Sequence, residues 1–204
     1  YLNSLFQTGL KNLLDRAVID RGEALGLRDV AKTWWKEDEI PFDFVRRRMS
    51  VVLTQSKKEH ILICKGAVEE MLEICSQIED AGLVKPLSEE YRAQLKSLRD
   101  RLNEDGLRVV CVGYKRLPPD CPPLTVKDEC NLVFSGFVAF LDPAKETTAE
   151  ALRLLRDHGI AVKILTGDNA IVARKICRDV GLDVQHVATG SEVEPLDDAA
   201  QRLR

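Results

Sequence analysis

The sequence lacks the features that identify several large classes of protein. Its formal net charge is only −3 over 204 residues. This argues against a general nucleic-acid binder, because such proteins gain affinity by neutralising phosphates. The longest apolar run, Val133–Leu141, has about half of the roughly 20 residues that a bilayer-spanning helix needs. We therefore expect no nucleic-acid partner and no direct insertion of this segment into a membrane.

The cysteines are too scattered to indicate a metal site or a disulfide framework. There are six, none forms a Cys-x-x-Cys pair, and they do not cluster with the three histidines. Zinc sites and disulfide scaffolds depend on such spacing. Free thiols in a reducing cytoplasm are the better interpretation, and we expect no protein-bound metal.

Motifs for the common phosphate chemistries are also missing. The sequence contains no Gly-x-x-x-x-Gly-Lys-[Ser/Thr] loop, no Gly-x-Gly-x-x-Gly loop, and no Asp-x-Asp or Asp-Lys-Thr-Gly that would supply an aspartyl nucleophile. The chain opens "YLNSLFQTGL", without an initiator methionine or a signal peptide. We interpret it as a piece of a longer protein.

The first part of the chain predicts an antiparallel α+β domain. Hydrophobic residues make up 45% of the sequence, enough for a core. Periodicity indicates a helix over Leu10–Leu25, a strand over Thr33–Ile40 that stops before Pro41, and a hairpin of Arg48–Gln55 with His60–Lys65. Further elements are expected in this order: helix Ala67–Cys75, helix Ser88–Asp105, strand Leu107–Tyr114 and a proline-rich loop, Leu117–Pro123.

The pattern changes after the proline-rich loop. Strand Leu132–Leu141, helix Thr147–His158, strand Ala161–Leu165 and helix Ala170–Val180 form a βαβα series, which is typical of a parallel sheet. The expected fold class is therefore α/β (α+β), with one domain over residues 1–130 and a partial second domain over residues 131–204.

Two predicted strands of the second domain end in "LDPAK" and "LTGDN". If these strands are neighbours, Asp142, Lys145, Thr166 and Asp168 project into one crevice at their carboxyl ends. A hydroxyl and a lysine could hold phosphoryl oxygens, and the carboxylates could take part in metal or hinge interactions. The alternative is that Asp142 and Thr166 only cap helices. A free-standing phosphatase would need an aspartyl nucleophile, and none is present.

A second candidate site lies in "EIPFDFVRRRMSVVL". An aromatic residue before a basic cluster can stack on a base while an arginine reaches a phosphate. The alternative is that Phe42 and Phe44 belong to the core and that Arg46–Arg48 form a solvated face.

Three further polar residues are candidates for the binding site, and each also has an interpretation without a binding role. Lys65 ends a strand beside Gly66, which permits close backbone approach, but it is equally compatible with a surface lysine at a turn. Arg108 opens a strand, where it would contact phosphate or cover the sheet edge. Asp15 lies beside the apolar stripe of its helix, where an ordinary exposed residue would also fit.

Together these stretches resemble the cytoplasmic part of a P-type ATPase. "KGAVEE" is similar to that family's Lys-Gly-Ala-Pro-Glu motif, "LTGDN" to its Thr-Gly-Asp motif and "LDPAK" to its Asp-Pro-x-[Arg/Lys] hinge. The order and spacing fit along essentially the whole chain. The bacterial magnesium-transporting members are the most similar, over "YLNSLFQTGLKNLLDRAVI", "EIPFDFVRRRMSVV" and "FLDPAKETTAEAL".

The resemblance implies a nucleotide-binding domain followed by part of a haloacid-dehalogenase-like phosphorylation domain. In the first domain it implies that Phe42 stacks on adenine, that Met49 packs beneath the base, and that Arg108 approaches the phosphates. The full set of ATP-binding residues that it implies is Asp15, Phe42, Met49, Lys65, Gly66 and Arg108.

In the second domain the resemblance implies a phosphoryl site at Thr166, Gly167 and Asp168, with Asp142 at the interdomain hinge. Two departures from the family pattern matter. Val68 replaces the proline after Lys-Gly-Ala. Lys145 stands where many members have arginine, so it offers a single ammonium charge in place of a planar guanidinium with several donors.

The resemblance also implies a function for the whole enzyme. ATP with Mg²⁺ would be held here while its γ-phosphoryl group passes to an aspartate outside this chain, at the cytoplasmic face of the bacterial inner membrane. The partners would be the actuator domain, the rest of the phosphorylation domain and the membrane helices. We expect the chain itself to be soluble and to bind ATP without turning it over. Two alternatives stay open. One is a calcium or proton pump, and the other is a non-catalytic interaction module built on the charged helices.

Overall fold

The computed structural model describes residues 1–9, 11–55, 59–119, 121, 123–167, 169–184 and 186–193. The chain forms two compact units. Residues 1–97 and 109–140 make the first, and residues 98–108 and 141–204 make the second. Within the described residues, no helix has both the length and the apolar character that crossing a bilayer demands.

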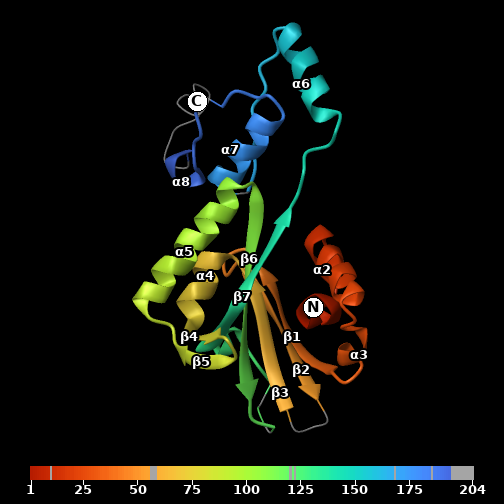
Figure 1. Cartoon of the computed structure of the whole chain (residues 1–204), viewed down its shortest axis with the longest axis vertical. Coiled ribbons are helices and arrows are strands. Elements are labelled where there is room, and N and C mark those ends of the chain that lie inside the picture. Colours follow the sequence, from red (N-terminus) through yellow and green to blue (C-terminus); the bar gives the residue numbers. More distant parts are fainter. Residues whose placement is uncertain are drawn as a thin grey trace. The chain divides into compact units, whose positions relative to one another are not determined.

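The first unit is built on a seven-stranded sheet (Figure 1). The pairs β1–β2, β2–β3, β3–β6 and β4–β5 are antiparallel, whereas β4 pairs in parallel with β7. The predicted hairpin is confirmed as β2 and β3. In sheet order the strands are β1 (Trp35–Asp43), β2 (Arg48–Gln55), β3 (Glu59–Gly66), β6 (Leu107–Leu117), β7 (Leu132–Leu141), β4 (Cys75–Asp80) and β5 (Leu83–Pro86).

Strand alternation gives the sheet two buried faces. On one face, Met49, Val51 and Leu53 of β2 pack with Leu2 and Phe6 of helix α1 (Leu2–Phe6). Helices α2 (Leu13–Ala24) and α3 (Arg28–Ala31) complete the N-terminal segment, which lies on the same side of the sheet as α1 in Figure 1.

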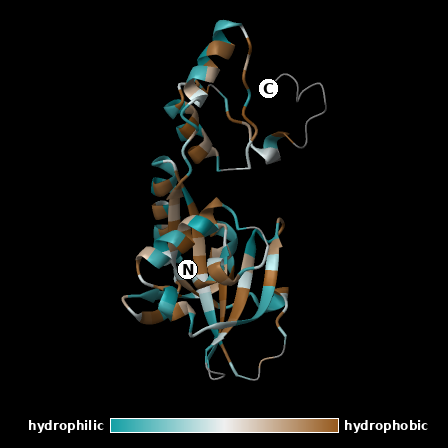
Figure 2. Cartoon of the chain, turned by 90° about the vertical axis from the view of Figure 1, so that its right-hand side faces the viewer, coloured by the Kyte–Doolittle hydropathy of each residue, from teal (hydrophilic) through white to brown (hydrophobic). Residues whose placement is uncertain are grey.

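The opposite face carries the larger core. Val52 of β2 and Leu62 of β3 pack there with Met71 and Leu72 of helix α4 (Val68–Ile74). The N-terminal part of helix α5 (Glu89–Glu104) adds Tyr91 to this cluster. Hydrophobic residues are prominent along the strands, whereas the helices alternate hydrophobic and hydrophilic residues (Figure 2), as amphipathic helices on a sheet do.

Two boundaries in the first unit differ from the sequence-based expectation. Strand β1 continues through Pro41 to Asp43, because β1 is an edge strand and a missing N–H costs nothing on an unpaired side. The helix after β3 ends at Ile74, and β4 begins directly at Cys75, where the sequence predicted continued helix.

The second unit contains helices α6 (Thr148–Asp157), α7 (Ala170–Asp179) and α8 (Gly190–Val193). The first two were predicted. The predicted strand over Ala161–Leu165 is wrong, because these residues have no regular structure. β7 already lies between β6 and β4, so neither of its edges is open to another strand. The haloacid-dehalogenase-like βαβα unit is therefore not confirmed, and the functional boundary between residues 130 and 131 stays a prediction.

Candidate nucleotide-binding site

Lys65 and Asp15 form the centre of the candidate site. Asp15 lies in the first turn of α2 and is fully buried, and its carboxylate forms an ion pair with the ammonium group of Lys65. Asn12 caps this helix by accepting a hydrogen bond from the Asp15 backbone N–H at 2.8 Å. Asp15 is thus not the exposed helix residue of the alternative interpretation, and Lys65 is not a surface lysine.

Gln7 connects the two charged groups. Its amide donates to Asp15 Oδ2 at 2.5 Å, and its carbonyl oxygen accepts from Lys65 Nζ at 2.8 Å. Burial opposes ionisation of Asp15, but hydrogen bonds from Lys65, Ser4 and Gln7 outweigh it and lower the pKa of the carboxyl. Burial also lowers the pKa of Lys65, which Asp15 partly offsets.

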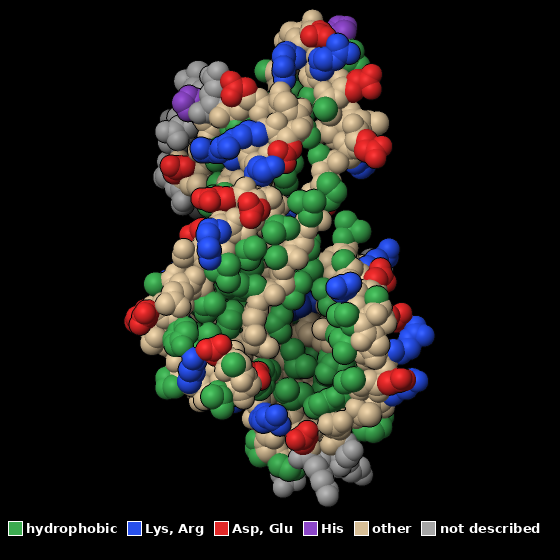
Figure 3. All heavy atoms as spheres, in the orientation of Figure 1, with side chains coloured by type: hydrophobic (Ala, Val, Ile, Leu, Met, Phe, Trp, Pro, Cys, Tyr) green, Lys and Arg blue, Asp and Glu red, His purple; other side chains and the backbone are tan. Residues whose placement is uncertain are grey.

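Lys65 borders a pocket of about 290 Å³ between the N-terminal helices and the sheet. Its walls are mainly apolar: Leu14 and Val18 come from α2, Ile63 from β3, and Val110 from β6. Figure 3 shows hydrophobic side chains gathered on this face between α2 and β7, where the surface is hollowed. An apolar pocket with the Lys65 ammonium at its wall suits a flat, mostly apolar group that carries polar edges.

Met49 and Gly66 lie beside Lys65, but neither is among the described residues that line the pocket, and Phe42 is not among them either. Met49 lies directly opposite Lys65 in the β2–β3 ladder and is buried, so both side chains project from the same face. A Cβ on Gly66 would lie 2.5 Å from the Arg48 Cβ and 2.7 Å from the Arg47 carbonyl oxygen. Only glycine allows that backbone approach.

Phe42 is a surface residue, not a core residue. The residue is 52% exposed, and its ring meets that of Phe44 edge to face, with 5.3 Å between centroids. Phe44 is 89% exposed. The interpretation of these rings as core is therefore wrong, and Phe42 is available for stacking.

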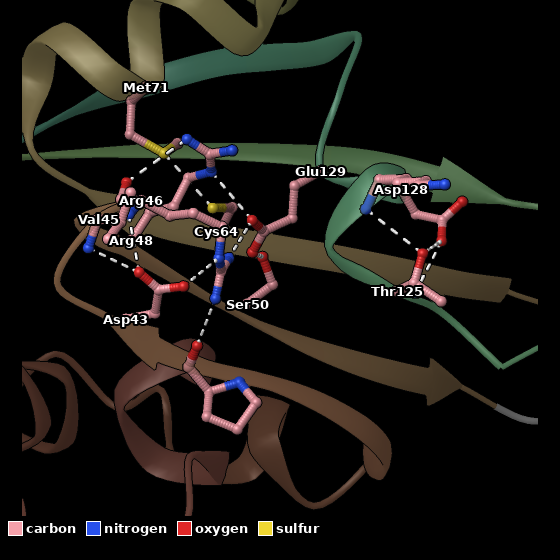
Figure 4. A network of polar contacts seen from close by, with 12 residues as sticks. Asp43, Val45, Arg46, Arg48, Ser50, Cys64, Met71, Thr125, Asp128 and Glu129 are labelled. Carbon is pink, nitrogen blue, oxygen red and sulfur yellow. Dashed lines mark hydrogen bonds and ion pairs between the residues drawn. The ribbon is translucent and has the colours of Figure 1, made fainter.

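The basic cluster after Phe44 faces inward at two of its three positions (Figure 4). The buried carboxylate of Glu129 accepts hydrogen bonds from Arg46, from Arg48 Nε at 2.9 Å and from Ser50 Oγ at 2.7 Å. Arg47 instead pairs with Glu70 at 2.9 Å on the surface. The solvated basic face of the alternative interpretation is therefore wrong for Arg46 and Arg48, since both already neutralise Glu129.

In the second unit, Arg108 and Asp142 are brought together. Arg108 Nη1 lies 3.1 Å from Asp142 Oδ2, so the residue expected near phosphate pairs with the one expected at the hinge. Asp142 and Lys145 also line a pocket of about 290 Å³ together with Ile176 of α7.

The predicted phosphoryl site is only partly described. Thr166 and Gly167 are exposed and lie outside the pocket lined by Asp142, because the strand that would have carried them there is absent. Asp168 falls outside the described residues. Neither Asp142 nor Thr166 caps a helix: α6 begins after Thr147, and Asn169 caps α7.

Sequence reasoning missed Gln7 and Glu129. Neither belongs to a recognisable local motif, and Glu129 lies 81 residues from its partner Arg48. Only the fold brings these side chains to the residues that they contact.

Comparison with known proteins gives a consistent result. The family described as "P-type ATPase, cytoplasmic domain N" matches residues 7–147. The chain is similar to "Magnesium-transporting ATPase, P-type 1" of Escherichia coli strain K12, with 50% identity over 198 residues, which cover 97% of this chain and 22% of that protein.

Two further relatives are more distant. A protein of the same name from Salmonella typhimurium strain LT2 is 41% identical over 202 residues, covering 98% of this chain and 22% of that protein. A calcium-transporting ATPase of Listeria monocytogenes is 34% identical over 170 residues, covering 82% and 19%. The chain therefore spans about a fifth of the length of these relatives.

Proposed function

The chain belongs to the P-type ATPase family, in which it matches the cytoplasmic N domain, and we propose that it binds ATP between the N-terminal helices and the sheet. Phe42 would stack on the adenine ring, Met49 would pack beneath it, and Lys65 would donate hydrogen bonds to the nucleotide. Gly66 would keep the backbone close to the pocket, and Asp15 would hold the Lys65 ammonium in position.

The observation that carries this proposal is the position of Lys65. Its ammonium lies at the wall of an apolar pocket of about 290 Å³, at the lower end of the range for small-molecule sites. That volume suits one part of ATP better than the whole nucleotide. Lysine can move its charge on a flexible stem, so Lys65 can exchange part of its contact with Asp15 for a ligand.

In the whole enzyme, ATP would be bound with Mg²⁺ and its γ-phosphoryl group transferred to an aspartate outside this chain. Arg108 would approach the phosphates, Asp142 would act at the hinge, and Thr166, Gly167 and Asp168 would belong to the phosphoryl site. Energy from this transfer would drive ion translocation across the bacterial inner membrane, with this domain on the cytoplasmic side.

We propose magnesium as the transported ion. The support is the higher identity to the magnesium-transporting relatives, 50% and 41%, than to the calcium-transporting one, 34%. A calcium or proton pump is the alternative. Transport by the whole protein, assayed with each ion in vesicles, decides between them, and transport of calcium alone would overturn the magnesium proposal.

The remainder of the same polypeptide would be the partner of the second unit. Leu165 is 97% exposed, and Ile164 beside it is also exposed. The rest of the phosphorylation domain, together with the actuator domain and membrane helices, would complete the enzyme and cover this apolar segment. Without those parts we expect the chain to bind ATP but not to hydrolyse it.

An NMR titration with Mg-ATP tests the binding site. We expect saturable shifts around Phe42 and Lys65, with a dissociation constant of roughly 1 mM, or about −4 kcal/mol. Phe42→Ala should weaken binding at least about fivefold, because base–aromatic stacking is worth about 1–3 kcal/mol. Val45→Ala is the matched control, since it shortens a residue that is 90% exposed in the turn directly after β1.

Equal effects of the two substitutions would contradict the stacking role of Phe42. No shifts at high ATP concentration in a folded sample would overturn ATP binding altogether and favour the interaction module. Sustained ATP hydrolysis by the purified chain would contradict the expectation of binding without turnover.

A further inference from the structure

Arg46 holds both residues that flank Phe42. Its Nη2 donates to the Pro41 carbonyl oxygen at 2.7 Å, and its Nε donates to Asp43 Oδ2 at 3.1 Å. Phe42 is the residue between these two acceptors. One guanidinium therefore fixes the backbone before the ring and the side chain after it (Figure 4).

The guanidinium is itself anchored. Its third nitrogen, Nη1, donates to the carboxylate of Glu129, which is fully buried. Arg48 and Ser50 of β2 bind the same carboxylate, at 2.9 Å and 2.7 Å. The end of β1 that carries Phe42 is thus tied, through Arg46, to a buried carboxylate on the sheet.

The turn also has internal constraints that depend on Asp43. Its Oδ1 accepts hydrogen bonds from the backbone N–H groups of Val45 and Arg46, at 2.7 Å and 2.9 Å. This Asx-type turn directs the chain back toward β2. Asp43 therefore uses one oxygen to shape the turn and the other to bind Arg46.

We propose that Arg46 is the positioning residue for Phe42, and that it sets the affinity for the adenine base without touching the nucleotide. The proposal rests on the proposed stacking of Phe42 on adenine. A surface residue such as Phe42, which is 52% exposed, would otherwise lose backbone and side-chain freedom on binding. Holding residues 41 and 43 in advance removes part of that entropic cost.

The arginine beside it provides a matched control. Arg47 is adjacent in sequence and carries the same charge, but its side chain is 54% exposed and pairs with Glu70, whereas that of Arg46 is 15% exposed. Arg46→Gln leaves the Glu129 carboxylate with Arg48 and Ser50, so no unpaired buried charge is created. Arg47→Gln removes one positive charge from the same turn without releasing Pro41 or Asp43.

The experiment measures binding of ATP and of adenosine to the wild-type chain and to both variants by NMR titration. We expect Arg46→Gln to weaken both ligands by the same factor, about threefold to tenfold, as for the ordering of one side chain on binding. Arg47→Gln should change neither by more than about twofold. Arg46→Lys should not rescue binding, because Arg46 reaches its three acceptors from three different nitrogens, whereas all three donors of lysine are on one nitrogen.

A double-mutant cycle with Phe42→Ala adds a readout that a general loss of structure would not give. If Arg46 acts through Phe42, Arg46→Gln should have no further effect on binding once Phe42 is alanine. Thermal unfolding of each variant establishes that the samples are folded at the titration temperature.

The outcomes separate this proposal from the proposed function. A loss of affinity for ATP but not for adenosine would overturn positioning and indicate a direct phosphate contact. Additive effects of Arg46→Gln and Phe42→Ala would overturn it as well. If Phe42→Ala itself leaves ATP binding unchanged, the stacking site fails, and the role of Arg46 fails with it. If only Arg46→Gln is without effect, the stacking site stands and the positioning role is refuted.

Discussion

Two buried carboxylates on opposite faces of one sheet are neutralised in different ways. Asp15 meets the single ammonium group of Lys65 and the amide of Gln7, beside an apolar pocket. Glu129 meets two guanidinium groups and the hydroxyl of Ser50. Arginine forms directional, multidentate contacts, whereas lysine is a compact charge on a mobile stem.

The comparison separates a permanent connection from an exchangeable one. The Glu129 cluster uses all three nitrogens of Arg46 on fixed protein acceptors, which suits a structural anchor. Lys65 is held at one end of a pocket that can admit a ligand. The same kind of ion pair thus supports the turn on one face and a candidate binding site on the other.

The largest expected effect comes from removing the Glu129 carboxylate. Glu129→Leu should lower the free energy of unfolding by about 3–5 kcal/mol, because Arg46 and Arg48 then lose their buried counter-ion. Urea denaturation measures the change. Glu90→Leu, at an exposed position of α5, should stay within about 0.5 kcal/mol. Equal losses in the two variants would contradict the anchor role of Glu129.

Asp15→Asn should have a smaller effect, about 1–3 kcal/mol, because Gln7 and Ser4 still contact Lys65. The pKa of Asp15 is lowered from 3.8 in the folded chain. Its contribution to stability is therefore fully present above pH 3.8 and is lost as pH falls through the lower folded-state pKa.

Urea titrations at neutral and acidic pH test the direction of this pH dependence. The stability difference between wild type and Asp15→Asn should shrink below pH 3.8. Asp20→Asn, at an exposed position of the same helix, serves as the control. A difference that grows on acidification would show that the pKa of Asp15 is raised by burial instead.

The smallest effect is expected for Ser50→Ala. Glu129 keeps both arginines, so only one hydrogen bond at 2.7 Å is lost, worth about 1.5 kcal/mol of unfolding free energy, the lower end for a charged acceptor. ATP affinity should not change, because Arg46 keeps its three contacts. Calorimetric unfolding and an ATP titration check the two parts, and a large loss of ATP affinity would place Ser50 in the binding site instead.

Local patterns were sufficient to predict much of the first unit. The β2–β3 hairpin was predicted because both strands are apolar-rich and a charged segment separates them. Strands β4 and β5 were missed because they are short, with exposed residues at most positions. Their place in the sheet depends on β7, which is more than 45 residues later in the sequence.

In the candidate site, too, the sequence predicts neighbours only where they are close along the chain. Lys65, Met49 and Gly66 could be grouped because two strands of one hairpin place them together. The failure of the predicted strand over Ala161–Leu165 has a topological cause, since the available edges of β7 are occupied by β6 and β4. An apolar segment identifies a strand only when an open sheet edge exists for it.

Pro41 has a consequence for how separate molecules of this protein meet. It lies in β1 at one edge of the sheet, and the β1–β2 register shifts between Ile40 and Asp43. The other edge, β5, has only four residues and ends at Pro86. Irregular, proline-containing or very short edges are poor templates for a strand from a neighbouring molecule. Both ends of the sheet therefore discourage the edge-to-edge pairing that leads to aggregation.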